Sequence, residues 1–298
     1  MSLVESVLAR VKKVEGSAGV STSAPDSGKR RPPTASYKAD AAAPAPAPEP
    51  TERIVAAERT MHRQGAIDNR VLLEDRAGEN SAAAAAYRIL RARLLRRVRT
   101  HGWTTIGVTS ATPDDGKSLT VLNLGISLAR EGNSEVVLLD LDLRDPSLCQ
   151  YLGLSPPGAL QDYFARRSPA SEMFFSIGVD NLLVAAATER TDRASELLGS
   201  REFDDLIQYI KRRCAKPIIL IDLPPVLVTD DVLVVAPKID ALLFVAAEGR
   251  TRRTDLEKAL GLLSEYPMAG MVLNCALEAG LAYGYGYGYG YGLNGSRG

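Results

Sequence analysis

One loop of the chain has the residue types and spacing that bind a phosphate. The segment ATPDDGKS, from Ala111 to Ser118, lies between an apolar run and a helical pattern and ends in the GK[ST] triplet of a P-loop. Backbone amides from Pro113 to Leu119 would surround a β-phosphate at the start of the helix. Lys117 would bridge the β- and γ-phosphates, and the Ser118 hydroxyl would bind Mg²⁺. The nucleotide-binding residues expected here are Ala111, Thr112, Pro113, Asp114, Asp115, Gly116, Lys117, Ser118 and Leu119.

Acidic residues follow two other apolar runs. Asp140 and Asp142 come after VVLL, and Asp222 comes after IILI. Alternation along an extended chain places the first two carboxylates on one side of the backbone. Carboxylates at strand ends beside a triphosphate are suited to hold magnesium, and one of them could accept a proton from an attacking hydroxyl. The alternative is that each aspartate only caps the turn or helix after it.

The chain ends in a cluster of hydroxyl acceptors. The segment YGYGYGYGYG, from Tyr283 to Gly292, alternates tyrosine with glycine, a spacing typical of a mobile segment. The candidate phosphate acceptors are Tyr283, Tyr285, Tyr287, Tyr289 and Tyr291. Each phosphate would add about −1.5 to −2 charges and repel its neighbours. Without phosphorylation, such a tail would be a low-complexity segment that associates through aromatic contacts.

Composition restricts the class of protein. Lys plus Arg and Asp plus Glu are both 36 in 298 residues, so net charge gives no reason to expect a nucleic-acid partner. The scattered cysteines Cys149, Cys214 and Cys275 predict reduced thiols, and His62 and His101 are too isolated for a zinc site. No apolar run reaches the roughly 18 residues of a membrane span. We expect a cytoplasmic protein, brought to the inner membrane by a partner.

Composition also divides the chain. Residues 1–78 combine an amphipathic helix at MSLVESVLARVKKVEG with a Pro/Ala-rich linker, and residues 51–78 have weak helical character. The first helix would either pack on its own domain or dock on a partner. Residues 79–280 are predicted to form the nucleotide-binding domain, and residues 281–298 the tyrosine-rich tail.

The elements that must position these residues alternate between strand and helix. The predicted strands are Thr104 to Thr109, Glu135 to Asp140, Asn181 to Ala186, Pro217 to Asp222, Ala241 to Ala246 and Gly270 to Asn274. The predicted helices are 81–98, Ser118 to Glu131, Glu202 to Arg213 and Arg252 to Ser264. Strands that are apolar throughout indicate a sheet covered on both faces. The expected fold is therefore a P-loop NTPase-like three-layer α/β/α domain with a mainly parallel sheet.

The three motifs together resemble the bacterial tyrosine kinases of polysaccharide biosynthesis, which are P-loop enzymes. That family has a P-loop, then apolar residues with DxDxR, then apolar residues with DxPP. The corresponding segments here are ATPDDGKS, VLLDLDLR ending at Arg144, and IILIDLPP. The resemblance extends from about Ala82 to the end of the chain. The opening segment and ASELLGS, from Ala194 to Ser200, are similar to the exosortase-associated branch.

The resemblance implies ATP and Mg²⁺ as cofactors and the tail as an autophosphorylation cluster. It implies magnesium held by Ser118 with Asp140, Asp142 and Asp222, and an adenine contact from Asn274. Asp140 and Asp142 are both candidates to activate the tyrosine hydroxyl. The implied reaction transfers the ATP γ-phosphoryl group to tyrosine. The implied partner is an inner-membrane polysaccharide co-polymerase or chain-length regulator, and the chain could form a homo-oligomer.

Two departures from the family pattern leave alternatives open. Asp114 occupies a position that is usually glycine and that could need a positive φ, so activity could be weak or absent, as in a nucleotide-binding scaffold. Ala85 replaces the glutamate of an ExxRxxR ring motif, in which Arg88 and Arg91 fit. A ParA/MinD-like ATPase switch is the other alternative, but that class has lysine where this loop has Thr112.

Overall fold

The computed structural model describes residues 54, 62–63, 65–73, 81–156 and 158–276. The amphipathic helix, the linker and the tyrosine tail expected from the sequence lie outside these residues. The described residues belong to one compact unit. Among the described helices, none is long and apolar enough to cross a membrane.

A six-stranded parallel sheet forms the centre of this unit, with strand order β5-β3-β6-β2-β7-β8. Its strands are β2 (Thr105–Ser110), β3 (Glu135–Asp140), β5 (Leu182–Ala186), β6 (Pro217–Asp222), β7 (Ala241–Ala247) and β8 (Met268–Asn274). Every residue of β2 and β7 is buried, as expected for interior strands of a sheet covered on both faces. All six strands predicted from apolar runs are confirmed, with bounds that differ by two residues or fewer.

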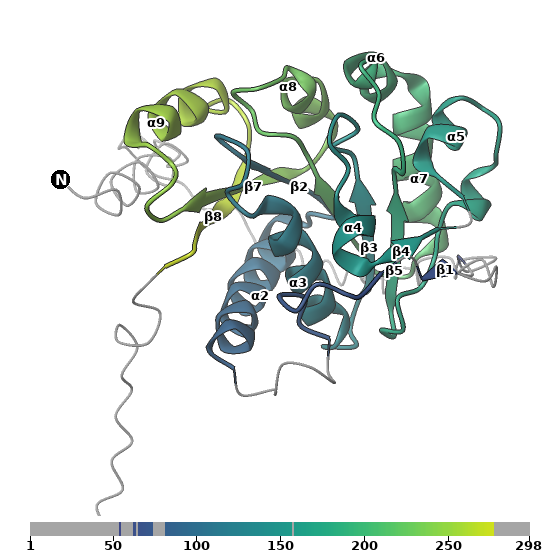
Figure 1. The fold of residues 1–298 in the computed structure, drawn as a ribbon, viewed down its shortest axis with the longest axis horizontal. Helices are drawn as coiled ribbons and strands as arrows, with labels where there is room; N and C mark the ends of the chain where they lie inside the picture. The colour runs from purple at the N-terminus through teal and green to yellow at the C-terminus, as the bar shows by residue number, and fades with distance from the viewer. Residues whose placement is uncertain (1–53, 55–61, 64, 74–80, 157, 277–298) are drawn as a thin grey trace, which may run out of the picture. The chain divides into compact units, whose positions relative to one another are not determined.

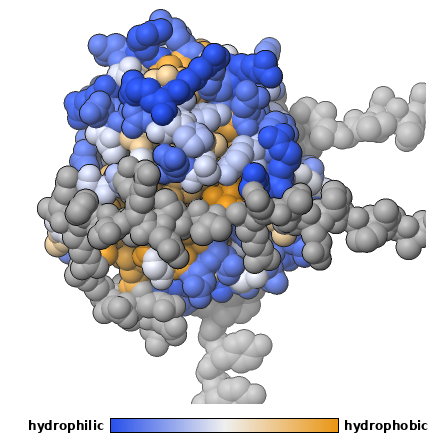
Figure 2. Space-filling view, turned by 90° about the vertical axis from the view of Figure 1, so that its right-hand side faces the viewer, coloured by the Kyte–Doolittle hydropathy of each residue, from blue (hydrophilic) through white to orange (hydrophobic). Residues whose placement is uncertain are grey.

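Helices cover both faces of the sheet (Figure 1), which confirms the three-layer architecture. The longer helices are α2 (Ala82–His101), α3 (Lys117–Ala129), α7 (Arg201–Arg213) and α9 (Arg253–Leu262), all at predicted positions. The helices α2 and α3 pack together and share a core cluster with alternate residues of the strands. On the side where α5 and α7 lie, most of the visible surface is hydrophilic (Figure 2). This is expected for helices whose apolar residues face the sheet.

The helix α2 has defined signals at both ends. Ser81 Oγ accepts a hydrogen bond of 3.1 Å from the Ala84 amide and caps the first turn. Gly102 ends the helix at φ 71°, and its amide bonds to the Val98 carbonyl. Leu94 and Leu95 are buried and belong to the hydrophobic core.

Short elements that the sequence pattern does not predict complete the unit. They are β1 (His62–Arg63), α4 (Leu148–Leu152), β4 (Leu154–Ser155), α5 (Leu160–Phe164), η1 (Ala170–Glu172), α6 (Ala194–Gly199), α8 (Asp231–Val235) and η2 (Ala236–Lys238). The first of these, β1, pairs antiparallel with β4. Five-residue helices are too short to show a 3.6-residue period, so their positions depend on tertiary packing.

The weak helical character expected for residues 51–78 is wrong where this range is described. Residues 62–63 form β1, and residues 65–73 contain no helix. Instead, the Leu72 amide donates to Asn123 Oδ1 at 2.8 Å, and Asn123 Nδ2 donates to the Arg70 carbonyl at 3.0 Å. Val71 is fully buried. These contacts with α3 override local propensity, and they place residues 65–73 on a unit that we expected to begin at residue 79.

Candidate functional site

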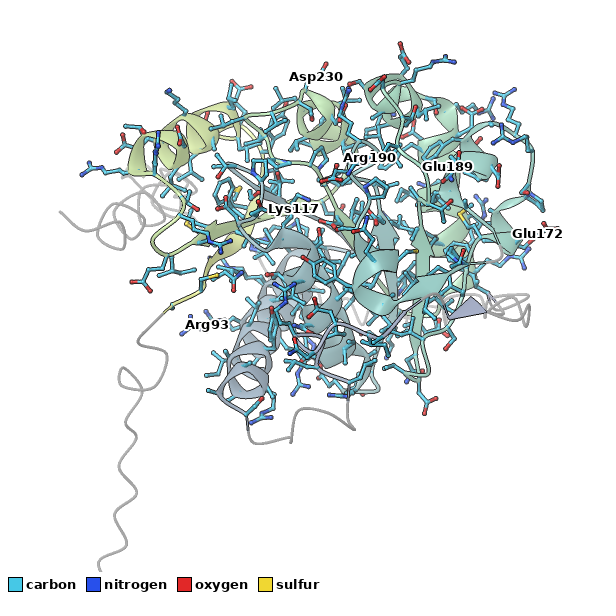
Figure 3. All side chains as sticks on the ribbon, viewed as in Figure 1. Arg93, Lys117, Glu172, Glu189, Arg190 and Asp230 are labelled. Atoms are coloured by element: carbon cyan, nitrogen blue, oxygen red, sulfur yellow. The ribbon has the colours of Figure 1, made fainter. Side chains whose placement is uncertain are left out.

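The loop between β2 and α3 contains two residues with positive φ. Asp114 has φ 62° and Gly116 has φ 86°, and α3 begins at the next residue, Lys117. The positive φ expected at Asp114 is thus confirmed, and aspartate tolerates this region better than most side chains. Lys117 lies in the centre of the unit, at the start of α3 (Figure 3). The loop therefore presents its backbone amides at the N-terminus of a helix, where anions bind.

The end of β8 supports this loop from the side. Asn274 Nδ2 donates a hydrogen bond of 3.0 Å to the Asp115 carbonyl. A Cβ atom placed on Gly116 would lie 2.1 Å from the same nitrogen and displace the Asn274 side chain, and the φ of 86° favours glycine as well. Asn274 is thus at the predicted nucleotide loop, and its contact with adenine stays a prediction.

Lys117 joins the loop to the acidic strand ends. Its Nζ donates to Asp142 Oδ2 at 2.6 Å and lies 4.0 Å from Asp222 Oδ1. Burial alone would lower the pKa of Lys117, but the charges of Asp222 and Asp142 outweigh it and raise this pKa. The ammonium group therefore stays charged next to the position where phosphates are expected.

Two of the three carboxylates are fully buried, and three of their oxygens lack a hydrogen-bond partner. Asp140 pairs with Asp222 in the register of β3 and β6, so the two side chains are neighbours at the carboxyl end of the sheet. Asp140 Oδ1 and both carboxylate oxygens of Asp222 are buried and accept no hydrogen bond in the structure. Burial raises the pKa of Asp222 to about 6, partly countered by the charge of Lys117. Burial and the charge of Asp222 raise the pKa of Asp140 well above its ordinary value.

The capping role that we considered for these aspartates is present, but it uses only part of each carboxylate. Asp140 Oδ2 accepts hydrogen bonds from the amides of Ser147 and Leu148, at 3.1 and 3.0 Å, where α4 begins. Asp142 Oδ1 accepts one of 3.2 Å from the Asp145 amide. These bonds hold the two side chains in place and leave Asp140 Oδ1 free.

The buried oxygens and the loop with glycine at position 116 fit a magnesium nucleotide. A buried polar atom without a partner is costly, so such a group in a folded protein calls for a ligand or ion. Within the described residues, no three His, Cys, Asp or Glu side chains form a ready ligand set for a metal ion. Magnesium does not require one, because it keeps several waters and takes one or two carboxylates together with phosphate oxygens. The side chains that could hold it, directly or through water, are those of Ser118, Asp140, Asp142 and Asp222.

Sequence reasoning did not find the residues that hold Arg144, the arginine of the second motif. Its Nε donates to Asp231 Oδ2 at 2.8 Å, and its Nη2 lies 3.3 Å from both Asp231 Oδ1 and Ser195 Oγ. Asp231 is fully buried, and Ser195 belongs to the ASELLGS segment. The family resemblance of that segment was the available signal for Ser195. Nothing in the local sequence marks Asp231.

A pocket of about 440 Å³ opens beside Arg144, within the described part of the chain. It is lined by Arg144, Val226, Leu227, Val228, Thr229, Asp230 and Leu233. Four of these seven residues are apolar, and Val226 follows Asp222 by four positions in the chain.

Comparisons with known proteins show which proteins are similar to this chain in sequence. The chain is 29% identical over 172 residues to tyrosine-protein kinase CpsD of Streptococcus pneumoniae serotype 4, covering 57% of this chain and 74% of the relative. It is 32% identical over 154 residues to the succinoglycan biosynthesis transport protein ExoP of Rhizobium meliloti, covering 49% of this chain and 19% of that protein. No protein-family model matches.

Solved structures agree with these relatives. The kinase domain of the Escherichia coli tyrosine kinase ETK superposes with a TM-score of 0.65 at 25% identity, covering 76% of this chain and 88% of that one. The parallel sheet with its P-loop, the paired acidic strand ends and these relatives agree with the resemblance seen in the three motifs. Over these residues the chain is similar in sequence and fold to bacterial tyrosine kinases.

Proposed function

We propose that this chain is an ATP-dependent protein tyrosine kinase that phosphorylates tyrosines of its own C-terminal tail. The observation that carries the proposal is the group of buried oxygens on Asp140 and Asp222 that accept no hydrogen bond, beside Lys117 and a P-loop. This arrangement is suited to bind a triphosphate with magnesium. The named relative CpsD, a tyrosine-protein kinase, supports the choice of acceptor.

Each residue of the site would have a defined task. The loop amides and Lys117 bind and orient the phosphates of ATP, and Ser118 with the three aspartates holds magnesium. Magnesium, when bound, would neutralise charge on the phosphate oxygens. Asp140 and Asp142 both stay candidate proton acceptors: Asp142 Oδ2 is bonded to Lys117, and Asp140 Oδ2 to the amides of Ser147 and Leu148.

The acceptors proposed are the tail tyrosines at positions 283, 285, 287, 289 and 291. The pocket beside Arg144 is large enough for an aromatic side chain, and a guanidinium group can lie against a ring. Because each phosphate adds about −1.5 to −2 charges, several of them would separate neighbouring subunits or a membrane partner. We propose that this change regulates exopolysaccharide polymerisation or export.

The partner proposed is an inner-membrane polysaccharide co-polymerase or chain-length regulator. The relative ExoP, a succinoglycan biosynthesis transport protein, supports this choice. Assembly into a homo-oligomer and membership of the exosortase-associated branch stay predictions. In the described structure, Arg91 of the expected ring motif donates to the Ser127 carbonyl at 2.9 Å, so it is engaged within its own protomer.

Mass spectrometry of the full chain after incubation with ATP and magnesium tests the proposal. We expect phosphate on tail tyrosines of the native protein and none on Lys117→Met. Unmodified tail peptides from a native protein that binds ATP would favour a scaffold or an ATPase switch instead.

A further inference from the structure

The nucleotide loop contains a buried carboxylate, that of Asp115, which is not needed to bind phosphate. Asp115 is 1% exposed, although it lies between two residues of the P-loop. Its Oδ1 accepts a hydrogen bond of 2.7 Å from the Thr251 hydroxyl. Its Oδ2 accepts bonds of 3.2 Å from both the amide and the hydroxyl of Thr112. The charge of Asp115 is therefore held by donors of the protein, and one of them is 136 positions away.

Thr251 connects this carboxylate to the end of a central strand. It is 6% exposed, and its Oγ1 accepts a hydrogen bond of 2.8 Å from the Ala247 amide, the last residue of β7. The same hydroxyl donates to Asp115. A single oxygen thus joins the rigid end of β7 to the P-loop.

A second contact from the same segment holds the neighbouring residue of the loop. Arg250 Nη1 donates to the Asp114 carbonyl at 3.1 Å, at the position with φ 62°. With the bond from Asn274 to the Asp115 carbonyl, the backbone on both sides of this carboxylate is fixed from outside the motif. A strained backbone conformation persists only where its surroundings hold it.

We propose that Asp115 and Thr251 form a brace that holds the P-loop in its nucleotide-binding conformation. The proposal rests on the nucleotide binding proposed above. The loop amides bind phosphate only when they converge on one point, and fixing them before binding lowers the entropy cost of binding. Asp115 and Thr251 are positioning residues, since they act through the loop.

The variant Thr251→Val tests the brace, with Thr251→Ser as its matched control. Valine keeps the shape but removes the hydroxyl, which leaves Asp115 and the Ala247 amide each without one partner. Serine keeps the hydroxyl. We expect the affinity for a fluorescent ADP analogue with magnesium, titrated at 20 °C, to fall about tenfold in Thr251→Val and to stay within about twofold of native in Thr251→Ser. In steady-state assays, KM for ATP should rise more than kcat falls.

Hydrogen exchange on the nucleotide-free protein gives a second readout that does not depend on activity. We expect the amides of residues 112–117 to exchange faster in Thr251→Val than in the native chain or in Thr251→Ser. A change of global stability alone would affect amides throughout the core.

Asp115→Asn separates the brace from simple electrostatics. Removing a negative charge from a phosphate-binding loop would strengthen ADP binding by Coulomb attraction alone. The brace predicts weaker binding, because an amide cannot accept all the bonds that Asp115 makes. This variant also decides the matter if Thr251→Val fails to fold.

Native affinity and native loop exchange in Thr251→Val would overturn the brace and leave the proposed function intact. Tighter binding by Asp115→Asn would also overturn it. A native chain that binds no magnesium nucleotide would overturn the proposed function, and the brace with it.

Discussion

Replacing Asp222 with asparagine should stabilise the nucleotide-free protein while removing its response to magnesium nucleotide. Asp222 is fully buried, both of its carboxylate oxygens lack a hydrogen-bond partner, and Asp140 is its neighbour in the sheet. The folded protein thus holds a charge that it does not fully compensate. We expect the ligand, and not the fold, to require that charge.

The magnitude follows from the pKa of Asp222, which burial raises from 3.8 to about 6. A shift of about two units means that the ionised group destabilises the fold by about 3 kcal/mol at pH 7.5. The buried amide of asparagine would itself lack partners and cost about 1–3 kcal/mol. The net gain expected for Asp222→Asn is about 1 kcal/mol, or about 3 °C in Tm for a unit of this size.

The pH dependence of stability tests independently whether ionised Asp222 destabilises the fold. Between pH 4 and 6 the folded state binds more protons at Asp222 than the unfolded state does, so this residue lowers the stability as the pH rises through that window. The advantage of Asp222→Asn should therefore be largest at pH 7.5 and should shrink by pH 4.5.

Thermal melts of the native chain and Asp222→Asn, with and without magnesium ADP, make the measurement. We expect ligand to raise Tm of the native protein only. Asp240→Asn is the matched control, because Asp240 Oδ2 accepts bonds from the amides and hydroxyls of Thr104 and Thr105. Burial would raise the pKa of Asp240, but these bonds outweigh it and lower it, so this control should be less stable than native. A destabilised Asp222→Asn, or one with a native response to ligand, would refute the reasoning.

Three further predictions use matched positions. Gly116→Ala should abolish nucleotide binding in an ADP titration, because its Cβ would overlap the side-chain amide of Asn274 at the end of β8. Gly132→Ala, also at positive φ but in open space, should lower the free energy of unfolding by about 1 kcal/mol and leave binding unchanged. In urea unfolding, Asp231→Asn should cost about 2 kcal/mol, because the buried Asp231 loses its pair with the partly exposed Arg144, and Asp205→Asn, in an exposed pair, less than about 0.5. Because the pKa of Asp240 is lowered, its stabilisation is present above pH 4 and lost as the pH falls further, so Asp240→Asn should show a shallower acid limb when Tm is followed from pH 5 to 2.5.

The chemistry of the site could be predicted because it is encoded locally. The GKS triplet, the aspartates after apolar runs and the bounds of β3 and β6 each depend on a few consecutive residues. Apolar runs without alternation left a buried parallel sheet as the consistent solution. The parallel sheet then brings the ends of β3 and β6 to one edge, whatever the connecting loops do.

Contacts between distant residues could not be predicted in this way. Asp231 is separated from Arg144 by 87 positions, and Thr251 from Asp115 by 136. The short helices and the packing of residues 65–73 also depend on surfaces that exist only after folding.

The sequence by itself determined the resemblance to bacterial tyrosine kinases, the parallel sheet and the residues around the expected phosphates, because strand period and motif spacing act over a few residues. Tertiary structure alone decided which carboxylates are left without partners and which are held by donors. That difference arises from burial and from hydrogen bonds across the sheet, and it separates Asp222, free for a ligand, from Asp115, committed to the loop.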